Sequence, residues 1–185
     1  MGRAAPNDHR RPGTAARPSG RNEAATMAKE AKTNAMRMLE RMKISYTSHE
    51  YDHDDGAIDG VSVATKLGQD PARVFKTLVT QGASRNYFVF VIPVAAELDL
   101  KKAAKSVGEK SVAMIHVADI NKVTGYIRGG CSPVGMKKKY PTFLDELCLL
   151  CDEIALSAGE RGHQMIVPPE PIAAMIDAKI VDLTK

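Results

Sequence analysis

The residues with the clearest chemical potential form a glycine- and proline-rich stretch over 129–135, followed after Met136 by Lys137, Lys138 and Lys139. Glycine allows a tight turn and a close backbone approach to a ligand, and proline fixes the turn. Backbone N–H groups in such a loop can bind a substrate, while the lysines attract phosphates. The segment therefore suits the end of a nucleic acid. A strand-connecting turn beside a solvated lysine face accounts for the same residues equally well.

A second candidate is Lys76, which is the charged side chain in the otherwise apolar run 74–79. A charge is costly to bury unless it has a partner or opens into a cleft. Lys76 is therefore the leading functional residue. The alternative is a lysine that points outward from a half-exposed strand.

Cysteine and histidine usage limits the chemistry further. Three cysteines, two of them (Cys148 and Cys151) in an apolar run, argue against a disulfide framework. Cys131 has no cationic neighbour in sequence and is not expected to act as a nucleophile. The histidines and aspartates of 49–54 have no matching ligand pair elsewhere, because the Cys148/Cys151 spacing lies in that apolar run. We expect no metal and no other cofactor.

Length and composition indicate one ordinary domain. The chain has 185 residues, of which 44% are hydrophobic, and this suffices for a single full core. The longest apolar runs are too short to cross a bilayer, and the N-terminus lacks the apolar stretch of a secretory signal. These features predict a soluble cytoplasmic protein.

The first 26 residues differ in kind from the rest. Five arginines against Asp8 and Glu23, with several prolines and no apolar periodicity, predict a disordered extension. This extension carries +3 of the net charge of +4, so residues 27–185 are nearly neutral and their basic signal is local. Met27 resembles a natural start, which makes the extension an upstream readthrough or an expression remnant; an Arg-rich targeting or RNA-contacting arm is the alternative. The domain is predicted over 27–185.

Periodicity and capping signals predict a mixture of helices and short strands. Helices are expected over 33–43, 62–67, 99–107, 118–124 and 170–176. Paired strands are expected over 74–81 and 87–94, with further strands over 45–51, 112–115, 153–157, 164–167 and 179–182. The glycine-rich loop spans 125–136, with strand character expected on either side. Short strands mixed with helices make the fold class α+β.

Several separated segments carry a resemblance to a known family. They are Phe-Lys-Thr-Leu at 75–78, Leu-Lys-Lys-Ala-Ala-Lys at 100–105, Thr-Gly-Tyr at 124–126, Gly-Gly-Cys-Ser-Pro-Val-Gly at 129–135 and Ser-Ala-Gly-Glu-Arg-Gly at 157–162. In this order they resemble the YbaK/EbsC group of trans-editing domains, which is related to the editing insertion domain of prolyl-tRNA synthetases. The resemblance covers roughly residues 32–183. It implies a single domain with a mixed, mostly antiparallel, barrel-like sheet surrounded by helices.

The same resemblance implies a function and partners. The function is hydrolysis of the ester that joins a wrong amino acid to a tRNA, most typically cysteine on the proline tRNA. The implied partners are the 3′ acceptor end of the tRNA and prolyl-tRNA synthetase. In this reading Lys76 lines the editing pocket and holds the terminal phosphate or ribose, while the backbone N–H groups of Gly129 and Gly130 stabilise the oxyanion. Cys131, Ser132 and Pro133 of the same loop contact the substrate.

Two further residues match the family pattern. Tyr51 lies in the segment His-Glu-Tyr-Asp-His-Asp at 49–54 and positions substrate or water; a half-buried strand tyrosine with a wet hydroxyl is equally compatible. Arg161, between two glycines, contacts the tRNA end, as do Lys137, Lys138 and Lys139. An exposed loop arginine is its alternative.

Departures from the family pattern affect the mechanism. Gln164 occupies a position where cysteine-editing members carry aspartate, Val61 and Ser62 stand where acidic residues are common, and Met136 replaces glutamine. Without a protein base, the simplest mechanism is assisted by the substrate, through a tRNA ribose hydroxyl or the cysteine thiol. The alternatives are a deacylase for another amino acid such as alanine, and a non-catalytic module that binds a tRNA end or a synthetase.

Deleting residues 1–26 should leave fold and activity intact, because this segment has no apolar pattern able to join a core. Circular dichroism and an ester-hydrolysis assay on the shortened chain test this. A deletion of residues 1–43 serves as control, since it also removes the helix expected over 33–43. Loss of folded signal in the shorter deletion would contradict the assigned boundary.

Overall fold

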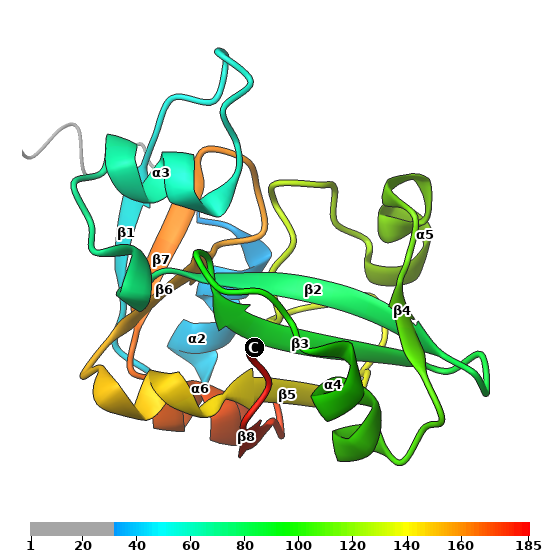
Figure 1. Ribbon diagram of the computed structural model, residues 1–185. Helices are drawn as coiled ribbons and strands as arrows, with labels where there is room; N and C mark the ends of the chain where they lie inside the picture. The colour runs from blue at the N-terminus through cyan, green and yellow to red at the C-terminus, as the bar shows by residue number, and fades with distance from the viewer. Residues whose placement is uncertain (1–31) are drawn as a thin grey trace, which may run out of the picture. The chain divides into compact units, whose positions relative to one another are not determined.

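The computed structural model describes residues 32–185, which form an α+β fold with two separate β-sheets (Figure 1). The predicted fold class is therefore confirmed. The extension predicted for residues 1–26 lies outside the described residues, and the domain boundary at Met27 stays a prediction. Within residues 32–185, no helix is both long and apolar enough to cross a membrane.

Most predicted elements form where their capping residues indicate. Helix α2 (Asn34–Arg41) begins at Thr33, whose hydroxyl accepts a hydrogen bond from the Met36 N–H at 3.2 Å. Helix α4 (Leu100–Val107) begins at Asp99 and ends at Gly108 in the left-handed conformation. The other predicted helices are found as α3 (Gly60–Lys66), α5 (Ile120–Thr124) and α6 (Pro169–Met175).

The larger sheet is built on one long hairpin. Strands β2 (Phe75–Gly82) and β3 (Tyr87–Pro93) pair antiparallel, in a register that sets Lys76 opposite Ile92. The strand order is β4-β2-β3-β5-β8, and β3, β5 and β8 run parallel to one another. The remaining strands of this sheet are β4 (Val112–Met114), β5 (Thr142–Asp145) and β8 (Lys179–Val181).

The smaller sheet is wholly antiparallel. It has the order β1-β7-β6, formed by β1 (Thr47–Glu50), β7 (His163–Val167) and β6 (Ile154–Ser157). Three short 3₁₀ helices complete the described fold, and they are η1 (Pro71–Arg73), η2 (Val117–Asp119) and η3 (Glu146–Leu150).

The predicted barrel-like sheet is wrong in one respect, because the sheets do not close. Between the two sheets, a single bridge joins Val74, just before β2, to Ala155 in β6. Strands β4 and β8 are the edges of the larger sheet. Closure requires a continuous ladder around the whole circumference, which one isolated bridge does not supply. The prediction of strand character on either side of the glycine-rich loop is also wrong, since helix α5 precedes it and β5 begins only at Thr142.

Two apolar clusters hold the sheets in place. The first lies between α2, α6 and the smaller sheet and includes Leu39, Val91 and Leu156. The second lies between α4 and the larger sheet, where the rings of Phe90 and Phe143 stack with centroids 5.5 Å apart. Both clusters include residues of β3, whose backbone is therefore buried on both faces. The start of β2, which pairs with β3, is fixed by this core and carries Lys76.

Candidate functional site

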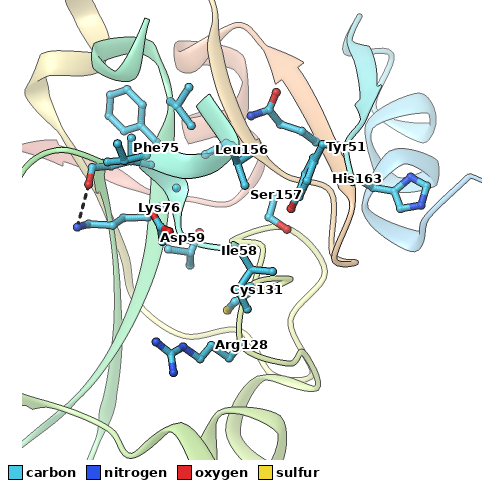
Figure 2. A pocket seen from close by; sticks show the side chains of 18 of the residues that line it. Tyr51, Ile58, Asp59, Phe75, Lys76, Arg128, Cys131, Leu156, Ser157 and His163 are labelled. Atoms are coloured by element: carbon cyan, nitrogen blue, oxygen red, sulfur yellow. Dashed lines mark hydrogen bonds between the residues drawn. The ribbon is translucent and has the colours of Figure 1, made fainter. Parts of the chain in front are cut away.

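A cavity of about 370 Å³ lies where the start of β2 meets α3, the glycine-rich loop and the smaller sheet (Figure 2). It brings together four of the residues singled out in the sequence, namely Tyr51, Lys76, Gly129 and Cys131. Its full lining is Tyr51, Ile58, Asp59, Gly60, Val61, Val63, Val74, Phe75, Lys76, Thr77, Leu78, Val94, Arg128, Gly129, Cys131, Leu156, Ser157, His163 and Gln164.

Lys76 supplies a half-buried cation to this cavity. Its ammonium donates a hydrogen bond to the carbonyl oxygen of Val94 at 3.2 Å, drawn as a dashed line in Figure 2. Burial lowers the pKa of Lys76, and the Glu97 carboxylate opposes this shift. No carboxylate among residues 32–185 forms a salt bridge with it. The remaining N–H donors are available to an incoming substrate.

The glycine-rich loop is closed at its base by Tyr126. The phenol of Tyr126 donates to the carbonyl oxygen of Val134, and burial raises the pKa of this phenol to about 12. A Cβ added at Gly135 would come 2.9 Å from the Tyr126 hydroxyl oxygen, and one at Gly159 would come 3.0 Å from its ring. The tyrosine therefore packs between two chain segments that approach it where glycine leaves room.

The double glycine allows the loop to touch the neighbouring turn. A Cβ at Gly130 would lie 3.0 Å from the backbone nitrogen of Arg161 and 3.2 Å from the carbonyl carbon of Glu160. The N–H of Gly130 donates to the carbonyl of Ile127 at 3.0 Å, so this N–H is not a free oxyanion donor. Gly129 has φ +83° and lines the cavity. The oxyanion role predicted for Gly130 is corrected on this ground.

Of the three residues that follow, Cys131 lines this cavity. Burial raises the pKa of the Cys131 thiol to about 11, which keeps it protonated at neutral pH. Ser132 is fully buried, and its hydroxyl accepts a hydrogen bond from the Val134 N–H at 3.2 Å. Pro133 lines a different cavity, of about 250 Å³.

The other basic residues singled out in the sequence are absent from the lining of this cavity. Lys138 and Lys139 line the cavity of Pro133 rather than that of Lys76, and Lys139 approaches Asp177 at 3.8 Å. The guanidinium Nε of Arg161 donates to the carbonyl oxygen of Arg128 at 2.7 Å. Arg161 therefore braces the glycine-rich loop, and Arg128, which sequence reasoning did not single out, lines the cavity instead.

Tyr51 reaches the cavity at the end of β1. Its N–H donates to the carbonyl of Gly162 at 2.9 Å, which extends the pairing of β1 with β7. The imidazole of His163 points away from Lys76 and Cys131 in Figure 2, and lies 3.9 Å from the carboxylates of both Glu50 and Glu160. Residues 32–185 contain no group of three His, Cys, Asp or Glu placed to share a metal ion.

Two polar residues of the lining are satisfied internally. Gln164 is 3% exposed and forms a reciprocal amide pair with Gln69, with N···O distances of 2.6 and 3.0 Å. The Asp59 carboxylate accepts hydrogen bonds from the Ser62 hydroxyl at 2.6 Å and the Ser62 N–H at 3.0 Å. These bonds lower the pKa of Asp59 and make it the cap of α3. An aspartate three residues before a serine at a helix start is the sequence signal that could have identified this cap.

The arrangement joins an apolar wall to a cation and a backbone loop. Phe75 and Leu156 supply buried apolar surface, and Lys76 and Arg128 supply positive charge. The lining thiol is protonated, and the lining carboxylate is occupied by its helix cap. Such a site can bind an ester-linked anionic substrate and stabilise developing negative charge, but it presents no activated nucleophile.

Comparisons with known proteins identify relatives of this chain. A family model described as the aminoacyl-tRNA editing domain matches residues 58–174. EbsC of Enterococcus faecalis, provisionally named a Cys-tRNA(Pro)/Cys-tRNA(Cys) deacylase, is 46% identical over 155 residues, covering 84% of this chain and 94% of the relative.

Solved structures show the same fold. One was provisionally assigned as a trans-editing enzyme for prolyl tRNA synthetase; it superposes with a TM-score of 0.70 at 23% identity, covering 84% of this chain and 99% of that one. The hypothetical protein APE2540 superposes with a TM-score of 0.74 at 17% identity, over 80% of this chain and 97% of that one.

The Tyr126 hydroxyl should stabilise the loop measurably. Tyr126→Phe removes the donor to the buried Val134 carbonyl, and we expect a loss of about 1–2 kcal/mol in the free energy of unfolding. Tyr87→Phe is the matched control, because the Tyr87 hydroxyl has no hydrogen-bond partner within residues 32–185, and it should change stability by less than about 0.5 kcal/mol. Urea unfolding measures both. Equal losses of unfolding free energy in the two variants would show that the Tyr126 hydroxyl does not stabilise the loop.

Proposed function

Because the chain belongs to the family of aminoacyl-tRNA editing domains, we propose that its cavity hydrolyses the ester linking cysteine to the proline tRNA. One observation carries the proposal: a half-buried lysine and a glycine-rich loop share a cavity whose own thiol is protonated and whose carboxylate caps α3. The name of EbsC supports cysteine as the amino acid removed.

Lys76 is suited to hold the end of the tRNA. One donor of its ammonium is fixed on the Val94 carbonyl, which orients the others. A ribose hydroxyl or the terminal phosphate accepts from these donors, and partial burial strengthens the interaction relative to one in bulk water. Lys76 also lies on β2, whose position is fixed by the core. The cation is therefore held in place before the substrate arrives.

The oxyanion site is assigned to the N–H groups of Gly129 and Cys131. Both residues line the cavity, and neither N–H has a hydrogen-bond partner within the described chain. A tetrahedral intermediate of ester cleavage places negative charge on the former carbonyl oxygen, which two such donors stabilise. Gly130 contributes by allowing the loop to pack, not by donating.

Hydrolysis then depends on groups of the substrate. In one route the cysteine thiol attacks its own ester carbon: the C–S bond forms, the ester C–O bond breaks, and the thiol proton passes to the leaving ribose oxygen. Water later opens the resulting thiolactone to free cysteine. In the other route the neighbouring ribose hydroxyl orients a water that attacks the same carbon, yielding cysteine and the free tRNA hydroxyl.

Partners beyond the acceptor end form part of the same proposal. The proline tRNA is the expected substrate, and prolyl-tRNA synthetase is the expected protein partner. Lys137, Lys138 and Lys139 lie along the chain beyond the loop and suit contacts with phosphates farther from the ester. An alanine deacylase and a non-catalytic tRNA-binding module remain the competing functions. Release of free amino acid from charged tRNA separates the module from either deacylase.

Lys76→Ala should lower kcat/KM for Cys-tRNA(Pro) by about 10²-fold or more, the scale of one positioned electrostatic contact. Its melting temperature should stay close to that of the parent protein, since Lys76 makes one hydrogen bond and no salt bridge within residues 32–185. Lys101→Ala, on the exposed surface of α4, is the control and should keep full activity. Near-parental turnover by Lys76→Ala would place this lysine outside the reaction.

The source of the reactive group can be tested on the substrate. We expect alanine-charged tRNA to be hydrolysed at least about 10²-fold more slowly than cysteine-charged tRNA if the thiol attacks, because the thiol is the better nucleophile. A tRNA ending in 2′-deoxyadenosine, charged with either amino acid, separates the ribose route from the thiol route. Equal rates for all these substrates would exclude assistance by the substrate and require a water activated by the protein.

A further inference from the structure

Arg128 lines the cavity but has no role in the chemistry described so far. It follows Ile127 in the loop and lies directly before Gly129. Its side chain is exposed, and in Figure 2 it extends from the loop to the same side of the view as the Lys76 ammonium. Within residues 32–185 its guanidinium has no salt bridge and no hydrogen-bond acceptor, and Asp59, the carboxylate in the lining, is occupied by Ser62.

The backbone of Arg128 is fixed although its side chain is free. Arg161 donates from Nε to its carbonyl oxygen at 2.7 Å. On the other side, Gly129 is packed so closely that an added Cβ would lie 2.9 Å from Ile58. The main chain of Arg128 is therefore fixed before a substrate arrives, and only its side chain remains to be ordered on binding.

We propose that Arg128 binds a backbone phosphate of the tRNA acceptor end, and that Arg161 acts through it as a positioning residue. The inference rests on the proposed function, in which the Gly129 N–H faces the ester carbonyl. Adjacent residues have Cα atoms about 3.8 Å apart. The Gly129 N–H, which faces the ester carbonyl, and the long cationic side chain of Arg128 therefore start from neighbouring points of the loop. The terminal nucleotide likewise carries its ester and its phosphate on one ribose. The planar guanidinium fits a phosphate bidentately.

Binding to an unreactive RNA tests the proposal directly. The probe is an acceptor-stem RNA ending in CCA that carries cysteine through a 3′-amide, titrated over a range of salt concentrations. Arg128→Gln should weaken binding about tenfold, and the slope of log K against log salt should become shallower by about 0.7, the value for one phosphate of a single strand. Arg128→Lys keeps the charge and should restore the slope.

Arg85→Gln is the matched control. Arg85 lies in the turn after β2 and is absent from the lining of the cavity. The end of β2 at Gly82 is six residues from Lys76, so the same charge is lost about 20 Å along the strand from Lys76. It should leave both the affinity and the slope unchanged. Circular dichroism verifies that all variants fold, as expected for substitutions at exposed positions.

Two results would overturn the proposal. One is unchanged affinity and slope in Arg128→Gln. The other is weaker binding in both Arg128→Gln and Arg128→Lys with the original slope, which would mean that the guanidinium stacks on a base. Deacylation of Cys-tRNA(Pro) by the parent protein is measured separately. If the parent protein deacylates Cys-tRNA(Pro) while Arg128→Gln binds the RNA normally, this inference fails and the proposed function stands. If the parent protein does not deacylate Cys-tRNA(Pro) while Arg128→Gln binds the RNA more weakly, the proposed function fails and phosphate binding by Arg128 stands.

Discussion

The cavity depends on one close approach between two backbone segments. The glycine-rich loop at 125–136 contacts the turn at 158–162, where a Cβ on Gly130 would meet main-chain atoms of Glu160 and Arg161. The two β-sheets share a single bridge, so their ladders alone do not fix the loop against the smaller sheet. Tyr126 and Arg161 hold this approach, one by packing and one through the Arg128 carbonyl. Side chains larger than hydrogen would separate the segments and widen the cavity.

The positive character of the cavity arises because its acidic and amide side chains are already hydrogen-bonded within the protein. Asp59 is committed to the start of α3, and Gln164 is paired with Gln69. The cations of the lining, Lys76 and Arg128, have no salt bridge within residues 32–185, and the N–H groups of Gly129 and Cys131 have no acceptor there, so all of these groups favour an anion. An ester becomes anionic only as it reacts, whereas the tRNA backbone is anionic throughout. Under the proposed function, the same field would serve both to bind the acceptor end and to stabilise the transition state.

The sequence predicted the helices and strands better than the tertiary contacts between them. The helices expected over 33–43 and 99–107 form and are capped by Thr33 and Asp99, and the paired strands expected over 74–81 and 87–94 form the β2–β3 hairpin. Strand β5 was missed because all four of its residues are buried, which erases the alternation that marks a half-buried strand. The hydrogen bond from Arg161 to the Arg128 carbonyl was not predictable, because it depends on which carbonyl the turn at 158–162 meets in space.

The neutral amide pair of Gln164 and Gln69 fits the proposed mechanism, in which the substrate supplies the reactive group. Gln164 is 3% exposed, and each amide of the pair both donates and accepts. An aspartate at this position could accept from Gln69 but would carry a nearly buried charge, which costs free energy unless a cation compensates it. Lys76 and Arg128 are cations of the same cavity. Under the proposed function, a neutral residue at position 164 leaves both cations uncompensated for the phosphate or ribose of the tRNA, at the expense of a carboxylate that could act as a base.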